Sequence, residues 1–183
     1  MVTGPVVEML ARNAKFATTY QSPPGLVQMA TALRASGKGV VVISCSDPRL
    51  NPYEVLGIDA SLKATMIRNA GGRVFDAIRT LAVLQTIGNP ATIVVIHHTD
   101  CGMTHFYDDD VKKALFKLSP EEKVAIEDMK FGEIKEGIEN SIREDVAILK
   151  ASPLIKKSTQ IIGIAYDIMT GVLTEVVGSK SEL

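Results

Sequence analysis

Stretches of nearly continuous apolar, β-branched residues recur along this chain and constrain its fold more than any other feature. Two of them, residues 40–43 (Val-Val-Val-Ile) and 92–96 (Thr-Ile-Val-Val-Ile), lack the alternation expected of a half-exposed strand. Such runs are typical of strands covered on both faces. Segments with the helical spacing of apolar residues lie between them. Strands that alternate with helices predict a parallel sheet with helices packed on its faces.

The predicted order is two helices, then strands separated by helices, then a terminal hairpin. The first two helices, 5–20 and 26–35, are separated by the strong break Ser22-Pro23-Pro24-Gly25. The fold class is therefore α/β, with a mostly parallel central sheet, one antiparallel strand and flanking helices. Strands are expected at 40–44, 64–68, 91–96, 160–166 and 172–177. Further helices are expected at 52–56, 75–87, 102–116 (broken), from Pro120 with Ser119 as its cap, and at 138–150.

Polar side chains follow two of these strands. Cys45, Asp47 and Arg49 come directly after the first apolar run, and alternation along an extended chain puts them on one side. His98 and Cys101 follow the other run, in His97-His98-Thr99-Asp100-Cys101-Gly102. Since sites in such sheets form beyond the carboxyl ends of the strands, the two stretches are expected to meet. Two sulfurs and one nitrogen with an open fourth position indicate a catalytic zinc, one per chain.

Simpler interpretations of these residues stay open at this stage. Cys45 and Cys101 could be buried thiols or a disulfide, although a disulfide is disfavoured in a reducing compartment. A thiol redox protein would usually carry a Cys-x-x-Cys pair, which the chain lacks. A zinc module without turnover would favour four closed ligands. His97 is expected to face away from His98 and pack in the core.

Composition narrows the class of protein. The chain has 183 residues, 46% of them hydrophobic and 22% charged, which suits a single globular domain spanning 1–183. A net charge of −1 favours neither nucleic acid nor an anionic membrane as a partner. No apolar run is long enough to span a membrane, and no secretory signal is evident. Only two cysteines are present, which favours a cytoplasmic location.

The motifs resemble the β-class carbonic anhydrases. Cys45-x-Asp47-x-Arg49, followed by His98-x-x-Cys101, matches five metal-site positions of that family in order. The segment between them, Arg68-Asn69-Ala70-Gly71-Gly72, is also similar, and so is the helix after it. The chain is most similar to a short branch that includes carbonyl sulfide hydrolases. Pro48 departs from the small residue that many members carry there, and it could alter how Asp47 and Arg49 are presented.

The resemblance implies a reaction in which hydroxide supplied by zinc attacks a small linear substrate. The expected reaction is reversible hydration of carbon dioxide to bicarbonate, and the alternative is hydrolysis of carbonyl sulfide to hydrogen sulfide and carbon dioxide. Asp47 either fills the fourth zinc position or is held off the metal by Arg49, and we expect Arg49 to hold it off in the active form.

The resemblance also implies a substrate pocket and an assembly. Gly71, Gly72 and Gly102 are expected at the pocket, although Gly71 and Gly72 could serve only a tight turn. His105 is a conceivable proton shuttle, and a surface residue otherwise. The helices of residues 1–36 are expected to form an arm over a partner subunit in a homodimer or homotetramer. Residues 108–110 (Asp-Asp-Asp) are expected to be a solvated helix start rather than a second metal site.

Overall fold

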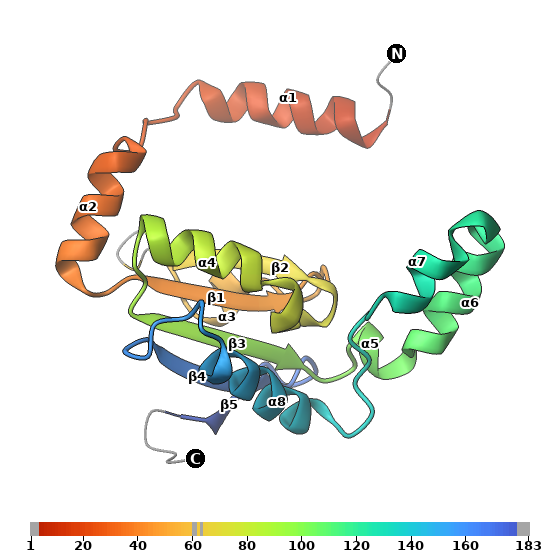
Figure 1. Ribbon diagram of the computed structural model, residues 1–183. Helices are drawn as coiled ribbons and strands as arrows, with labels where there is room; N and C mark the ends of the chain where they lie inside the picture. Colours follow the sequence, from red (N-terminus) through yellow and green to blue (C-terminus); the bar gives the residue numbers. More distant parts are fainter. Residues whose placement is uncertain (1–3, 60–61, 63, 179–183) are drawn as a thin grey trace.

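The fold is built on one five-stranded sheet. The computed structural model describes residues 4–59, 62 and 64–178. Its strands lie in the order β2-β1-β3-β4-β5, and the first four are parallel (Figure 1). Only β5 runs antiparallel, paired with β4 around a register shift between Gly163 and Ile164. The predicted α/β class is therefore confirmed. The strands are β1 (Val40–Cys45), β2 (Ala64–Asn69), β3 (Thr92–His98), β4 (Gln160–Tyr166) and β5 (Leu173–Val177).

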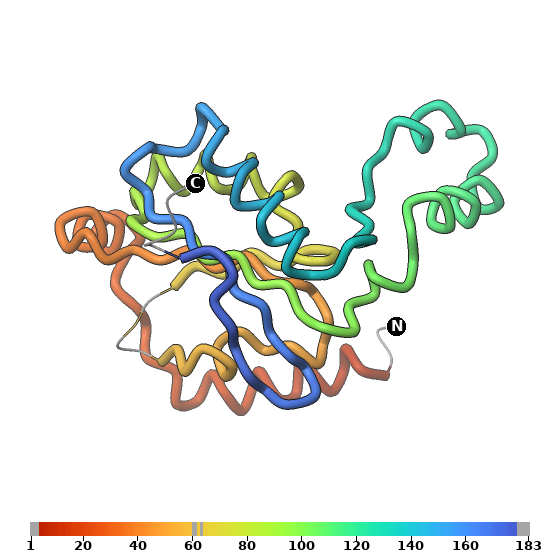
Figure 2. Tube along the Cα trace, turned by 90° about the horizontal axis from the view of Figure 1, so that it is seen from below, coloured from red at the N-terminus to blue at the C-terminus, as the bar shows by residue number. Residues whose placement is uncertain are grey.

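Two long helices cover one face of the sheet. α4 (Ile78–Ile87) connects β2 to β3, and α8 (Ile138–Ala151) connects β3 to β4, and both lie on the same side (Figure 2). The short α3 (Pro52–Val55), between β1 and β2, lies on the other side. The connections that follow the neighbouring strands β1 and β3 therefore run on opposite faces of the sheet. In sheets of this kind, ligands bind between two such strands, beyond their carboxyl ends.

Both faces of the sheet contribute to one core. The apolar runs found in the sequence contribute side chains to both sides of it, because these side chains point alternately to the two covered faces. Fully buried members come from β1, β3 and α8: Val41, Val42, Ile43, Ile93, Val95, Ile96, Ile142, Val146 and Leu149.

Two helical segments stand apart from this core. At the amino end, α1 (Pro5–Ala17) buries none of its side chains and lies away from the sheet, linked to it by α2 (Leu26–Ser36) (Figure 1). After β3, the chain enters α5 (Gly102–His105), α6 (Asp108–Leu118) and α7 (Lys123–Asp128). We call residues 108–128 the helical hairpin, and it projects from the side of the molecule (Figure 1).

The structure corrects two helix boundaries. The helix predicted at 5–20 ends at Ala17, where Thr18 bonds back to the helix with its hydroxyl. The helix predicted at 75–87 is a 3₁₀ turn, Val74–Asp76, followed by α4. Its break arises because Val74 N–H donates to a carboxylate of α8, and Ala77 N–H closes a tighter bond to Val74 O.

Ser119 is the N-cap residue ahead of Pro120, as predicted, but its side chain does not act as the cap. Ser119 makes no capping bond with its side chain, and its N–H instead closes α6 on Leu115 O at 2.8 Å. A 3₁₀ turn, Pro120–Glu122, follows before α7 begins at Lys123. The broken helix predicted at 102–116 is confirmed as α5 and α6. Within the described residues, no helix combines the length and hydrophobicity needed to cross a bilayer.

Candidate metal centre

Three predicted ligands meet at the carboxyl ends of neighbouring strands. Cys45 is the last residue of β1 and His98 the last of β3, and Cys101 follows two residues after the strand. One ligand atom from each lies within 4.8 Å of the others, and all three residues are buried. The two sulfurs are 3.8 Å apart and not bonded to each other, so the disulfide interpretation is wrong for this structure. We call Cys45, His98 and Cys101 the metal trio.

The orientation of His98 fits a metal ligand. Its Nδ1 lies 2.9 Å from Thr99 O, which fixes the tautomer with the proton on Nδ1 when the ring is neutral. Its Nε2 is fully buried and has no hydrogen-bond partner. A buried nitrogen without a partner costs free energy unless something binds it, and it faces two sulfurs. Zinc, a cation of borderline softness, would bind both this nitrogen and the two sulfurs.

The two sulfurs lie within hydrogen-bond distance of each other. Their hydrogen bond lowers the pKa of Cys45, although burial acts to raise it. Hydrogen bonds from His98 and from backbone N–H groups lower this pKa further. The same contact and burial raise the pKa of Cys101. The N–H of Asp47 lies 3.4 Å from Cys45 Sγ, and the N–H groups of Gly71 and Met103 also point to the sulfurs. These donors stabilise thiolates, the form that binds metal.

The predicted glycines differ in their surroundings. Gly72 is buried with φ +71°, and a Cβ there would lie 2.9 Å from the backbone N of Cys45. Only glycine allows the chain to pass so close behind β1. Gly71 has φ +71° as well, and a Cβ there would meet Met103 at 2.9 Å. Gly102 is exposed at the start of α5, with open space around it. That these glycines form a substrate pocket stays a prediction.

Asp47 lies beside the metal trio and is held by Arg49. Arg49 Nε is 3.0 Å from Asp47 Oδ1 and Nη2 is 2.7 Å from Oδ2, while Arg49 N–H donates to Oδ1 at 2.9 Å. Asp47 Oδ2 is 3.9 Å from His98 Nε2. The hydrogen bonds from Arg49 lower the pKa of Asp47 to about 2. The carboxylate is thus ionised and turned toward Arg49.

Sequence reasoning missed two residues that hold this loop. Arg68, at the end of β2, donates to the carbonyl oxygens of Cys45 at 3.1 Å, Asp47 at 2.8 Å and Leu50 at 2.8 Å. Asp100, in the turn before Cys101, accepts from Arg49 Nη1 at 2.8 Å. Both residues lie within the quoted motifs, but nothing in the pattern indicated that they contact the loop.

The remaining histidines occupy different environments. His97 is fully buried and faces α8, with Nδ1 2.7 Å from Ser141 Oγ and Nε2 3.2 Å from Asp145 Oδ2. The predicted core position of His97 is confirmed. His105 is exposed, and its Nε2 lies 2.7 Å from Asp100 Oδ1.

The acidic run begins a helix as predicted, but its first member is not simply solvated. Asp108 is half-buried and accepts from the N–H groups of Phe131 and Glu133, each at 3.1 Å. Glu133 in turn accepts from Asp108 N–H at 3.1 Å. These reciprocal bonds close the base of the helical hairpin.

Comparison with known proteins agrees with this geometry. The sequence model of the family described as carbonic anhydrase matches residues 40–173. The chain is 32% identical over 170 residues to "Beta-carbonic anhydrase 1" of Mycobacterium tuberculosis, covering 92% of this chain and 96% of that protein. A solved carbonic anhydrase from Streptococcus mutans superposes with a TM-score of 0.77 at 32% identity, covering 97% and 100% of the two chains. The chain therefore belongs to the β-carbonic anhydrase family.

A second kind of relative is present among the matches. "Carbon disulfide hydrolase" of Acidianus sp. (strain A1-3) is 33% identical over 151 residues, covering 70% of this chain and 72% of that protein. Relatives of this chain thus carry the names of two activities, carbonic anhydrase and carbon disulfide hydrolase.

Proposed function

We propose that this protein is a zinc-dependent carbonic anhydrase that interconverts carbon dioxide and bicarbonate. The observation that carries the proposal is the buried metal trio with Asp47 bound to Arg49, because this arrangement leaves a fourth ligand position available. When bound, zinc lowers the pKa of a water molecule to roughly 7 and so supplies hydroxide at neutral pH.

The protein's own residues divide the remaining work. Cys45, His98 and Cys101 would hold the ion, and their two thiolates would balance its charge. Asp47 is ionised and accepts a hydrogen bond from the nucleophile, which orients a lone pair toward the substrate carbon. Arg49 keeps this carboxylate off the metal. Ionisation of a water molecule gives hydroxide and a proton, and addition of the hydroxide to carbon dioxide gives bicarbonate. The proton passes to buffer, and His105 at the surface is a candidate carrier for it.

Hydrolysis of a sulfur-containing linear substrate is the second candidate. The relatives named carbon disulfide hydrolase favour it. The same nucleophile converts carbonyl sulfide and water to carbon dioxide and hydrogen sulfide, and carbon disulfide with two waters to carbon dioxide and two hydrogen sulfides. The family resemblance implies carbonyl sulfide as the alternative to carbon dioxide, and the relatives named carbon disulfide hydrolase add carbon disulfide to the test.

The deciding experiment is a paired assay on zinc-loaded protein. Stopped-flow hydration of carbon dioxide with a pH indicator is compared with headspace loss of carbonyl sulfide and of carbon disulfide. Fast hydration with little sulfide release supports the first function, and the reverse supports the second. Metal analysis should give about one zinc per chain. Stoichiometric zinc with neither activity would leave a zinc-binding module, and absence of zinc would sink both functions.

We also propose a homodimer or homotetramer in the cytoplasm, with residues 1–36 as an arm over the partner. The support is the exposed apolar row Val6, Met9 and Leu10 on α1, a helix that buries none of its side chains against the residues that the structure describes. Light scattering should give a dimer or tetramer mass, and Leu10→Lys should lower it. A wild-type monomer at micromolar concentration contradicts the assembly, and fractionation of cells tests the location.

A further inference from the structure

We infer that Asp100 is a positioning residue, braced by His105, which fixes Arg49 in the orientation that keeps Asp47 off the metal. The inference rests on the proposed function, because it concerns how the fourth metal position stays available. Asp100 touches neither substrate nor metal trio in this argument, and it acts through Arg49.

Arg49 is bound from two sides. Its Nε and Nη2 reach the carboxylate of Asp47, while Nη1 reaches Asp100 Oδ2 at 2.8 Å and Nη2 reaches Asp100 O at 2.9 Å. The Arg49 side chain is 49% exposed. A half-exposed ion pair gains little alone, because water competes and a long side chain must be immobilised. The second set of bonds supplies that immobilisation before the metal is bound.

The backbone of Asp100 is shaped for this contact. Its φ is +54°, in the left-handed region that few residues other than glycine adopt. Aspartate is among the residues that tolerate this conformation, at a modest cost. The conformation aims both the carbonyl and the carboxylate of one residue at the same guanidinium. Strained backbone of this kind persists where surrounding bonds over-determine it.

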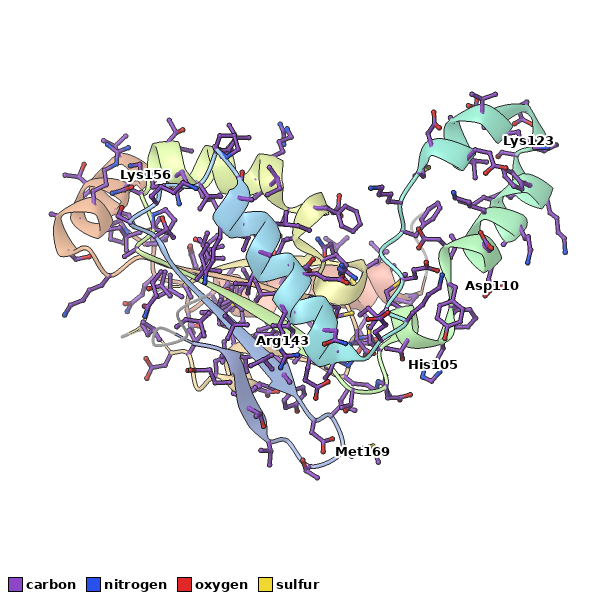
Figure 3. All side chains as sticks on the ribbon, turned by 60° about the horizontal axis from the view of Figure 1, so that its bottom comes forward. His105, Asp110, Lys123, Arg143, Lys156 and Met169 are labelled. Atoms are coloured by element: carbon purple, nitrogen blue, oxygen red, sulfur yellow. The ribbon has the colours of Figure 1, made fainter. Side chains whose placement is uncertain are left out.

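His105 completes the arrangement from outside. The two oxygens of Asp100 are divided, with Oδ2 on Arg49 and Oδ1 2.7 Å from His105 Nε2. His105 ends α5 and lies near the surface where the chain turns toward α6 (Figure 3). Thr104 ties this helix to the metal loop by bonding Cys101 O with its hydroxyl at 2.7 Å. A continuous chain of contacts, Asp47–Arg49–Asp100–His105, therefore runs from beside the metal trio to the surface.

The test measures access to the fourth metal position directly. Protein loaded with Co²⁺ is titrated with azide, and binding is followed by visible absorption. Asp100→Gly removes the side chain while keeping the backbone unstrained, Asp100→Asn keeps one acceptor, and His105→Gln keeps a donor. We expect azide affinity and carbon dioxide turnover to fall about tenfold in Asp100→Gly. The losses should be smaller in Asp100→Asn and smallest in His105→Gln. Asp128→Asn, an exposed carboxylate on α7, is the charge-matched control and should change neither.

A double-mutant cycle shows whether the effect passes through Asp47. In an Asp47→Ala background the fourth position cannot be closed by that carboxylate, so adding Asp100→Gly should leave azide affinity unchanged. Nitrogen-15 NMR of the Arg49 side chain in metal-free protein should show faster guanidinium rotation in Asp100→Gly. Wild-type azide affinity in Asp100→Gly, or an effect that persists without Asp47, overturns the inference. If Asp100→Gly does not fold, Asp100→Asn and His105→Gln decide by the same readouts.

The azide and NMR readouts separate this inference from the proposed function. If the wild type turns over neither oxygen nor sulfur substrates but the variants still lose azide affinity, the proposed function fails and the positioning role stands. If turnover is brisk and the variants bind azide like the wild type, the positioning role fails alone.

Discussion

Two arginine–carboxylate clusters lie on either side of β3, and they differ in exposure. At the rim, Arg49 bonds to Asp47 and Asp100, and its side chain is 49% exposed. Inside, Arg73 bonds to Asp145 with side chains only 8% and 0% exposed. The first cluster surrounds a candidate catalytic group, and the second joins parts of the fold. The exposed arginine–carboxylate pair thus orients a side chain, whereas the buried pair stabilises the packing of the fold.

The buried cluster joins three segments. Asp145, on α8, accepts from Arg73 Nε at 3.2 Å and from Val74 N–H at 3.1 Å, and its Oδ2 lies 3.2 Å from His97 Nε2 on β3. Arg73 also reaches the carbonyls of Gly132 and Glu133, at the end of the chain segment that returns from the helical hairpin. Removing one member therefore leaves charged groups buried without partners.

The largest expected effect is on stability, from the buried cluster. Asp145→Ala should lower the free energy of unfolding by about 3–5 kcal/mol, because Arg73 would stay buried without its one buried carboxylate partner and with only the exposed Glu144 beside it. Urea denaturation measures it. Glu144→Gln is the control, since Glu144 contacts the same guanidinium with a side chain 62% exposed and should change stability by less than about 1 kcal/mol. Equal losses of stability in Asp145→Ala and Glu144→Gln would mean that burial does not decide what an arginine–carboxylate pair contributes. The contrast between the two clusters would then fail.

The next effect is on turnover, from the rim. Arg49→Ala should reduce carbon dioxide hydration about a hundredfold, because Asp47 is then free to occupy the fourth metal position. The urea midpoint should fall by less than in Asp145→Ala, since the Arg49 side chain is 49% exposed and water competes for it. Arg49→Lys should be intermediate, as an ammonium cannot bond both oxygens in the same geometry. Full turnover in Arg49→Ala would refute the role given to this pair.

A smaller effect is expected beside the buried cluster. Ser141→Ala should cost about 1–3 kcal/mol of stability, because His97 Nδ1 loses a partner 2.7 Å away in a site without water access. Zinc content should be unchanged, since His97 faces away from the metal trio. Loss of zinc in this variant would mean that the two faces of β3 are not independent.

The smallest effect is a pH dependence at the rim. Asp47 has its pKa lowered to about 2 by Arg49, so its pair contributes stability above the unfolded pKa of about 4 and loses it as the pH falls toward 2. Carbon-13 NMR of metal-free protein should show this carboxyl titrating near 2. In Arg49→Ala the midpoint should rise toward the ordinary value. An unchanged midpoint would argue that another group holds the carboxylate.

The contrast also explains what could be predicted from the sequence. Apolar runs and helical spacing are local signals, so the strands, their order of appearance and the convergence of Cys45, His98 and Cys101 were predicted correctly. The buried cluster was not, because Arg73 and Asp145 are 72 residues apart and neither carries a local signature. The 3₁₀ break at Val74–Asp76 was missed for the same reason, since a bond to α8 causes it. Asp100 was missed because its left-handed conformation is set by its partners.

The reciprocal bonds between Asp108 and Glu133 join the start of the helical hairpin to the chain that follows it. The tip of the hairpin carries Lys123 (Figure 3). Chain length between those two bonded residues is therefore uncoupled from the position of Cys101 on one side and of Arg73 on the other. We therefore expect a change in the length of this hairpin to leave the metal trio in place. The hairpin is thus a modular insertion point, and it is the natural place to graft a tag or a tether onto this protein.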